Sequence, residues 1–494
     1  MKTTLWAGSL VCLAMCQVAL VVVTALQPQT SSGPPPPLPA SPVDFPDYDV
    51  RTLANGLQVV VVQHHEQPAV SLRLLVRAGA AQDPADTPGV AALVATLLDQ
   101  GTTTRSAAEI ADAIDYVGGG LGTGAGSDLT FVNVLVMKDS FDLALDLLSD
   151  VARRPAFATA ELERQRQQML SGLQVSYEDP DFIANIVIDR LIYGFHPYGV
   201  PTTGTPESLE AIDRDDLVAF HDTYFVPNNA ILAIVGDVSV EEALAGAERA
   251  FGDWARQEVP ATTRVEPPAP TRRLVIVDRP GAVQTELRVG HLAIPRRDED
   301  YLALQLASRI LGGEGANRLH NILRSERGLT YGAEAELSAF RQAGDLIADT
   351  DTRSDATAEV LQILVDEFWR LQRERVGSRE LAGAKAYMAG SFPLSIETPG
   401  AIALQILNVL FFGLDVDELE TYRERVNAVS PDDIQRVARR YLQPSRLSIV
   451  LVGDASRFSA ELEALGFEDY ELIPLEELDL TSGTLRRQPV AAAP

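Results

Sequence analysis

Runs of apolar residues alternate along the chain with stretches whose apolar positions recur at helical spacing. Strand-like runs occupy Leu57–Gln63 and Val70–Arg77, and the same pattern returns at Leu274–Asp278 and Gln284–Pro295. Long segments with helical periodicity follow each pair of runs, for example residues 159–175. Strands at the ends of each region with helices between them predict an α+β fold, in which a mostly antiparallel sheet is covered by helices.

Two segments of the chain match each other without a gap at a spacing of 217 residues. They are Asp213–Ser239 and Ser430–Ser456. Each starts with a helix N-cap candidate (Asp213 or Ser430), continues as a helix that ends in Tyr, and closes with an apolar strand followed by Gly-Asp. A repeat of this length predicts two homologous domains.

The ends of the chain and a Pro-rich interruption set the expected boundaries. Lys2 precedes an apolar run, and small residues allow cleavage after Ala25, which is typical of a signal peptide; a retained membrane anchor is the alternative. We expect a signal peptide at 1–25, a Pro-rich leader at 26–44, an N-terminal domain at 45–258, a linker at 259–271, a C-terminal domain at 272–480 and a mobile tail at 481–494.

Composition narrows the possible partners and the compartment. The chain is 46% hydrophobic and carries a net charge of −28, which repels nucleic acid and anionic membrane surfaces. Both cysteines, Cys12 and Cys16, lie inside the signal segment, so the cleaved chain can form neither a disulfide nor a thiolate metal site. We expect a periplasmic or secreted bacterial protein with no membrane contact after signal cleavage.

Several kinds of catalytic site are not supported by the residues. No two of the six histidines stand three or four apart, so no helix can present a His pair to a metal. The glycine-rich segment Gly118–Gly126 lacks the Lys and the following helix of a phosphate-binding loop, and we expect a flexible turn there. No Gly-x-Ser-x-Gly elbow is present, and no pair of carboxylates stands out.

The helix expected within Pro88–Thr102 resembles the active-site helix of the pitrilysin/insulinase zinc peptidases, in the group of the mitochondrial processing peptidase. That family places an inverted H-x-x-E-H motif between the same Gly and Gly-Thr landmarks. The three positions are Ala92, Ala95 and Thr96 here, and the family's third ligand, a Glu, falls near Gly172. None of these side chains can bind zinc as the motif does, so the resemblance implies a degenerate site with no metal and no cofactor in this chain.

The second half resembles the same family more fully. Leu311–Gly313 is similar to its glycine loop, and Arg324 and Tyr331 stand seven apart like its Arg/Tyr pair. Gly328 is expected to end the helix that carries the arginine, which would let the two side chains converge. The alternatives are a surface ion pair for the arginine and a core aromatic for the tyrosine.

The resemblance implies a non-catalytic, substrate-binding subunit of a heterodimeric zinc metalloendopeptidase. A homologous H-x-x-E-H subunit would carry the zinc, while Arg324 and Tyr331 would hold the carbonyl of a peptide or unfolded protein bound at a sheet edge. Two alternatives remain open: a structural scaffold subunit of a larger complex, and a peptide-binding protein that does not cleave.

Overall fold

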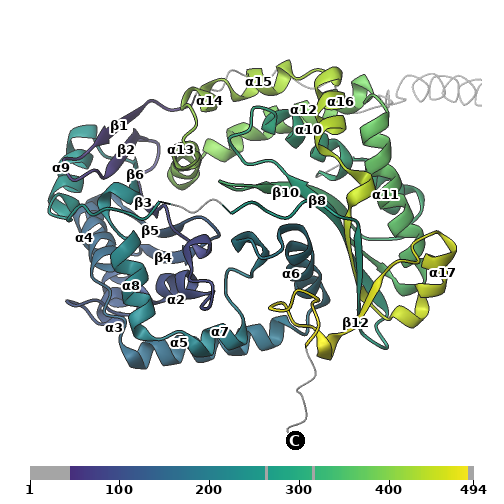
Figure 1. Cartoon of the computed structure of the whole chain (residues 1–494). Helices are drawn as coiled ribbons and strands as arrows, with labels where there is room; N and C mark the ends of the chain where they lie inside the picture. The colour runs from purple at the N-terminus through teal and green to yellow at the C-terminus, as the bar shows by residue number, and fades with distance from the viewer. Residues whose placement is uncertain (1–44, 262–264, 314–316, 488–494) are drawn as a thin grey trace, which may run out of the picture. The chain divides into compact units, whose positions relative to one another are not determined.

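The computed structural model describes residues 45–261, 265–313 and 317–487 (Figure 1). The expected signal peptide and leader lie outside the described residues. The described residues form one compact unit. Within it, the last helix of the first half ends at Phe251 and the first strand of the second half begins at Arg273, on either side of the Pro-rich segment predicted as a linker.

Each half builds a six-stranded sheet, and the two sheets have matching strand orders. The first sheet runs β1-β2-β6-β3-β5-β4 and the second β12-β7-β11-β8-β10-β9. The β2–β6 and β7–β11 pairs are parallel and the inner neighbours are antiparallel in both sheets; only the first edge differs, because β1 is antiparallel to β2 whereas β12 is parallel to β7. The strands are β1 (Tyr48–Thr52), β2 (Gln58–Gln63), β3 (Ala69–Val76), β4 (Gly120–Ala125), β5 (Thr130–Met137), β6 (Ala230–Gly236), β7 (Arg273–Asp278), β8 (Gln284–Ala293), β9 (Ala333–Ala339), β10 (Gly344–Arg353), β11 (Ser448–Gly453) and β12 (Glu471–Pro474).

Helices of the same half cover one face of each sheet. On the first sheet, alternate strand residues such as Leu72 and Ile234 pack with buried residues of α2 and α4; on the second, Leu287 and Leu346 pack with α10 and α11. The helices are α2 (Val90–Leu97), α3 (Ala107–Tyr116), α4 (Phe141–Arg153), α5 (Thr159–Ser176), α6 (Pro180–Tyr193), α7 (Pro206–Ala211), α8 (Arg214–Tyr224), α9 (Val240–Phe251), α10 (Tyr301–Gly312), α11 (Thr357–Arg373), α12 (Ser378–Ser391), α13 (Pro399–Phe412), α14 (Asp417–Glu420), α15 (Tyr422–Ala428), α16 (Pro431–Tyr441) and α17 (Ser459–Ala464).

The opposite face of each sheet, here called the exchange face, is covered by a helix from the other half. Helix α6 packs its isoleucines and valines on the second sheet, and α13 packs on the first. Figure 1 shows each of these helices beside the sheet of the other half. Both helices are 14 residues long, begin with Pro at the first turn after a capping residue (Asp179 or Thr398), and end at a glycine. This explains why strands such as β6 are apolar at every position: both faces are buried.

The repeated segments adopt equivalent structures. Asp213 caps α8 and Ser430 caps α16, and in each case the acidic residue three positions on (Asp216 or Asp433) completes a capping box. The strands that follow, β6 and β11, occupy the same place in the two sheets and end at a glycine. The prediction of two homologous domains with helix-covered, mostly antiparallel sheets is confirmed. The sequence analysis did not predict that helices cover both faces of each sheet.

Two local predictions were wrong. The glycine-rich segment 118–126, expected to be a turn, contains strand β4, because β5 offers it a full antiparallel ladder at the sheet edge. The tail was expected to be mobile from residue 481, but residues 481–487 fold back on the chain. Leu485 is 1% exposed in the cluster around α6, and Arg190 Nε donates to the Leu480 carbonyl at 3.0 Å.

No single helix in the described ranges is long and apolar enough to cross a membrane, and one sharply bent pair, 378–396 with 399–412, passes by length and composition only. The second helix of that pair is α13, whose apolar residues pack on the first sheet.

Candidate functional site

Helix α2 carries the positions predicted to correspond to a zinc motif, and its N-terminus is fixed by a half-buried carboxylate. Asp83 accepts hydrogen bonds from the backbone N–H groups of Gly89 (2.7 Å) and Ala91 (2.8 Å). Burial raises the pKa of Asp83 to about 7, although the backbone N–H donors act to lower it. Gly89 adopts φ +104°, and a Cβ there would meet the Thr203 carbonyl oxygen at 2.9 Å, so only glycine fits this close approach.

The three motif positions on α2 offer no metal ligand. Ala95 is 1% exposed, whereas Ala92 and Thr96 lie half-buried one turn apart. The Thr96 hydroxyl donates to the backbone carbonyl of Ala92 at 2.8 Å. Two methyl groups and a neutral hydroxyl are not zinc ligands, so these residues do not fit the metal.

The fourth position lies on α5, which packs against α2. Gly172 is exposed, and a Cβ placed on it would have no atom within 4 Å. Within the described parts of the chain, no group of three or more His, Cys, Asp or Glu side chains is arranged to hold a metal ion.

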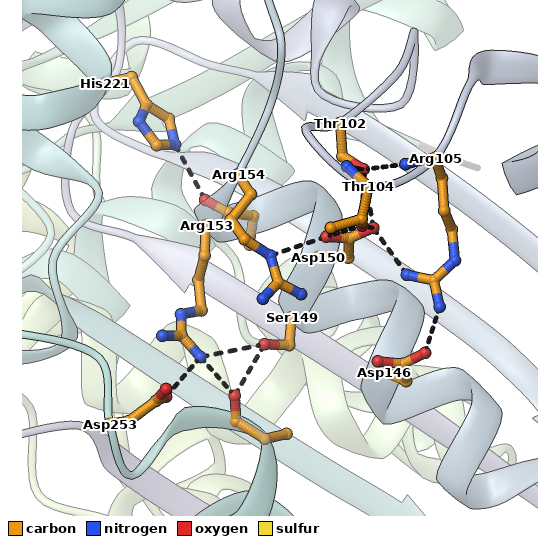
Figure 2. A network of polar contacts seen from close by, with 12 residues as sticks. Thr102, Thr104, Arg105, Asp146, Ser149, Asp150, Arg153, Arg154, His221 and Asp253 are labelled. Atoms are coloured by element: carbon orange, nitrogen blue, oxygen red, sulfur yellow. Dashed lines mark hydrogen bonds and ion pairs between the residues drawn. The ribbon is translucent and has the colours of Figure 1, made fainter.

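A buried acid holds the loop that follows α2 against α4 (Figure 2). The carboxylate of Asp150 accepts hydrogen bonds from the hydroxyls of Thr102 (2.8 Å) and Thr104 (2.9 Å) and from the guanidinium groups of Arg105 (2.7 Å) and Arg154 (2.8 Å). Burial alone would raise the pKa of Asp150, but these four donors hold it below its usual value. The Gly101-Thr102 pair therefore begins a loop that hydrogen bonds to Asp150 hold against α4, here called the pinned loop. Sequence patterns did not reveal these bonds.

The second predicted site, the Arg/Tyr pair, lies between α10 and the edge strand β9. Arg324 belongs to a π-helical turn (His320–Glu326), and Gly328 ends it with φ +62°. The backbone N–H of Leu329 donates to the Leu323 carbonyl at 2.8 Å, which reverses the chain as expected for a glycine-terminated helix.

This reversal brings Arg324 back to Tyr331, but through the backbone. A guanidinium nitrogen of Arg324 donates to the Tyr331 carbonyl oxygen at 2.5 Å. The Tyr331 side chain is 82% exposed, and Arg324 is exposed as well. Tyr331 is thus not a core aromatic, and its strand begins two residues later, at Ala333.

Strand β4 forms the open edge of the first sheet, and it has glycines at every position that faces the exchange face. Gly120, Gly122 and Gly124 lie opposite Leu135, Asn133 and Phe131 on the exchange face, so this edge has no side chains of its own there. Leu135 is 51% exposed. An edge of this kind leaves backbone groups and an apolar surface open to an added strand.

The chain has a duplicated, peptidase-like architecture. It consists of two six-stranded α+β halves that exchange helices, with a helix that carries the metal-motif positions but no ligands and with an exposed Arg/Tyr pair. Residues 58–205 match the family model described as Insulinase (Peptidase family M16), and residues 211–388 match the one described as Peptidase M16 inactive domain. The chain belongs to peptidase family M16.

Relatives with this architecture come from several bacteria. The chain is 24% identical over 390 residues to an uncharacterized zinc protease of Bacillus subtilis, which covers 79% of this chain and 94% of the relative. It is 29% identical over 353 residues to an uncharacterized zinc protease of Mycobacterium leprae, covering 70% and 78%. The crystal structure of a peptidase M16 inactive domain from Pseudomonas fluorescens superposes with a TM-score of 0.78 at 28% identity, covering 83% of this chain and 98% of that one.

Proposed function

We propose that this chain is the non-catalytic, substrate-binding subunit of a heterodimeric zinc metalloendopeptidase. The observation that carries the proposal is an asymmetry between its halves. The positions that would hold a metal are Ala92, Ala95, Thr96 and Gly172, which have no suitable ligand atoms, whereas Arg324 and Tyr331 present their side chains to solvent. A homologous subunit with an intact H-x-x-E-H motif would supply the zinc and its chemistry.

The Arg/Tyr pair suits a role in binding a peptide carbonyl. A guanidinium and a phenol are both hydrogen-bond donors, and the bond from Arg324 to the Tyr331 backbone uses only part of the donor capacity of the arginine. Two donors directed at one carbonyl oxygen would polarise it and stabilise the negative charge that develops when water attacks. The hydrogen bond to the Tyr331 carbonyl places the Arg324 guanidinium beside the backbone of the tyrosine.

Substrate binding by strand addition is the second element of the proposal. Strand β4 offers an unpaired ladder edge, and Gly120 and Gly122 leave open space beside Leu135 and Asn133 of β5, whereas the ring of Phe131 fills the space at Gly124. The net charge of −28 favours basic peptides or unfolded segments. We place the complex in the periplasm or outside the cell, in keeping with the signal-like N-terminus.

The proposal is tested by measuring peptide cleavage with this chain alone, with an H-x-x-E-H subunit alone and with the mixture. Only the mixture is expected to cleave. In the mixture, Arg324→Ala and Tyr331→Phe should each lower kcat by roughly 10²–10³, the loss seen when one oxyanion donor is removed. Arg353→Ala and Tyr116→Phe remove exposed residues of the same kinds elsewhere and should leave kcat unchanged.

The outcomes separate the alternatives. Unchanged kinetics in both Arg324→Ala and Tyr331→Phe would remove the pair from the site. Peptide binding without cleavage in any mixture would favour a non-cleaving binding protein. Purification from its natural source within a membrane complex, with no peptidase activity, would favour a scaffold subunit.

A further inference from the structure

A cavity of about 380 Å³ lies where equivalent segments of the two halves meet, away from the Arg/Tyr pair. Arg77 directly follows β3, and Arg297 follows β8, the strand in the same position of the second sheet. Asp128 and Arg341 lie in the equivalent hairpin turns β4–β5 and β9–β10. The cavity is lined by Arg77, Asp128, Arg297, Arg341, Gln342, Leu410, Phe411, Phe412 and Gly413.

Three of the lining side chains are guanidinium groups without a carboxylate partner. Among the residues that the structure describes, none of Arg77, Arg297 and Arg341 forms an ion pair. Arg77 donates to the side-chain oxygen of Gln58 at 3.2 Å, and Arg297 donates to the Gly413 carbonyl at 3.4 Å; both acceptors are neutral. Burial lowers the pKa of Arg77, and the like charge of Arg341 adds to this effect.

The one acid that lines the cavity, Asp128, already accepts hydrogen bonds from other residues. Both carboxylate oxygens of Asp128 accept from the Tyr198 hydroxyl, at 2.8 and 2.9 Å, and one also accepts from the backbone N–H of Arg341 at 2.9 Å. These bonds tie the two hairpin turns together and hold Arg341 in place. Three cations against one occupied carboxylate leave the cavity positive, in a chain whose net charge is −28.

The rest of the lining is apolar. Leu410, Phe411 and Phe412 form the last turn of α13, and the guanidinium of Arg341 lies 5.4 Å from the ring centroid of Phe411. A free phosphate would gain nothing from these side chains. An anion attached to an apolar group would place its charge among the arginines and its body on the phenylalanines.

From this combination we infer that the cavity binds a carboxylate carried on an apolar group, such as the C-terminal residue of a peptide. Its volume is within the range of small-ligand pockets and accommodates one or two residues. The same carboxylate chemistry is available from a peptide C-terminus and from an acidic side chain within a peptide. The inference stands apart from the proposed peptidase role, because binding here needs neither a partner subunit nor Arg324.

Isothermal titration calorimetry on the full chain, first with small probes, tests the site. N-acetyl-phenylalanine is expected to bind more weakly as salt rises, whereas its amide and inorganic phosphate should not bind. Three versions of one peptide then separate the sources: a free C-terminal Phe, the same peptide amidated, and an amidated version with an internal Glu. Binding of the first alone assigns the site to C-termini, and binding of the first and third assigns it to carboxylates in general.

Arginine variants identify the cavity itself. Arg341→Gln and Arg297→Gln should each weaken N-acetyl-phenylalanine binding by about tenfold or more, the usual effect of losing a hydrogen bond to a charged group. Arg353→Gln is the matched control and should bind normally. Equal binding of the acid and the amide, binding of phosphate in place of the acid, or full affinity in both cavity variants would overturn the inference. Arg297 is exposed, so its variant remains informative if the one at Arg341 fails to fold.

Discussion

Asp345 is a buried acid at the junction of the two halves, and it makes stability depend on pH in a calculable way. The residue lies on β10 of the second sheet and is 4% exposed, and one of its carboxylate oxygens accepts from the hydroxyl of Tyr193 on α6 at 2.6 Å. Burial raises the pKa of Asp345 from 3.8 to about 7, although the Tyr193 bond acts to lower it. Burial and the nearby Asp345 also raise the pKa of Asp189, to about 8.

Proton linkage determines whether stability rises or falls with pH. An acid with a higher pKa in the folded than in the unfolded state holds its proton more tightly when folded. The stability it contributes is therefore fully present below about pH 4 and is lost as the pH rises toward 7. The difference between 3.8 and about 7 corresponds to roughly 4 kcal/mol in total, of which about 2–3 kcal/mol falls between pH 5 and 8.

The substitution Asp345→Asn isolates this effect, because asparagine keeps an oxygen for the Tyr193 hydroxyl but cannot ionise. The variant should gain stability over the wild type by about 2–3 kcal/mol as the pH goes from 5 to 8. Urea unfolding at pH 5, 6, 7 and 8, followed by tryptophan fluorescence, measures the difference. Asp355→Asn removes an exposed carboxylate that lies just after the same strand and should track the wild type. Parallel curves for Asp345→Asn and wild type would show that Asp345 is ionised at little cost, and the reasoning would fail.

Three further predictions concern packing, the pinned loop and the repeated helices, and each is checked by urea or thermal unfolding. Ile406→Ala on α13, 0% exposed against the first sheet, should cost about 2–5 kcal/mol, and a loss below 1 kcal/mol would contradict the burial of this helix. Asp150→Ala should cost about 1–3 kcal/mol by leaving the buried Thr102 hydroxyl and the Arg154 guanidinium without their acceptor, whereas Asp146→Ala should cost under about 1 kcal/mol. Asp213→Ala and Ser430→Ala should each cost about 1 kcal/mol, and a large difference between them would argue against equivalent capping.

Local patterns predicted the fold well where a signal lies within a few residues. The apolar run at 58–63 and the capping residues Asp213 and Ser430 have short-range causes, and the structure places strand β2 and helices α8 and α16 there. Local patterns could not predict that α6 and α13 each pack on the sheet of the other half. An apolar helix face shows that a helix is buried, but not which of two similar sheets buries it. The all-buried pattern of β6 was the available clue that both sheet faces are covered.

In the candidate sites, too, features with a short-range signal could be predicted from the sequence, whereas contacts between distant residues could not. Gly328 ends the helical turn that carries Arg324, as predicted, but only the structure shows that the arginine contacts the tyrosine through its backbone carbonyl. Asp83, which fixes the start of α2, lies seven residues before the first residue of the helix and acts through a half-buried side chain, and no capping motif describes it. Arg77 is more than 200 residues from Arg297 and Arg341 in the sequence, and it meets them only because the two hairpin turns lie together.

The most direct test of the central claim is a cleavage and metal assay on three samples: the purified chain, an H-x-x-E-H subunit, and their equimolar mixture. The account predicts that the chain alone neither cleaves peptide nor retains stoichiometric zinc, and that the mixture cleaves with a rate that depends on Arg324 and Tyr331. Zinc-dependent cleavage by the chain alone, abolished by chelation and restored by zinc, would contradict it.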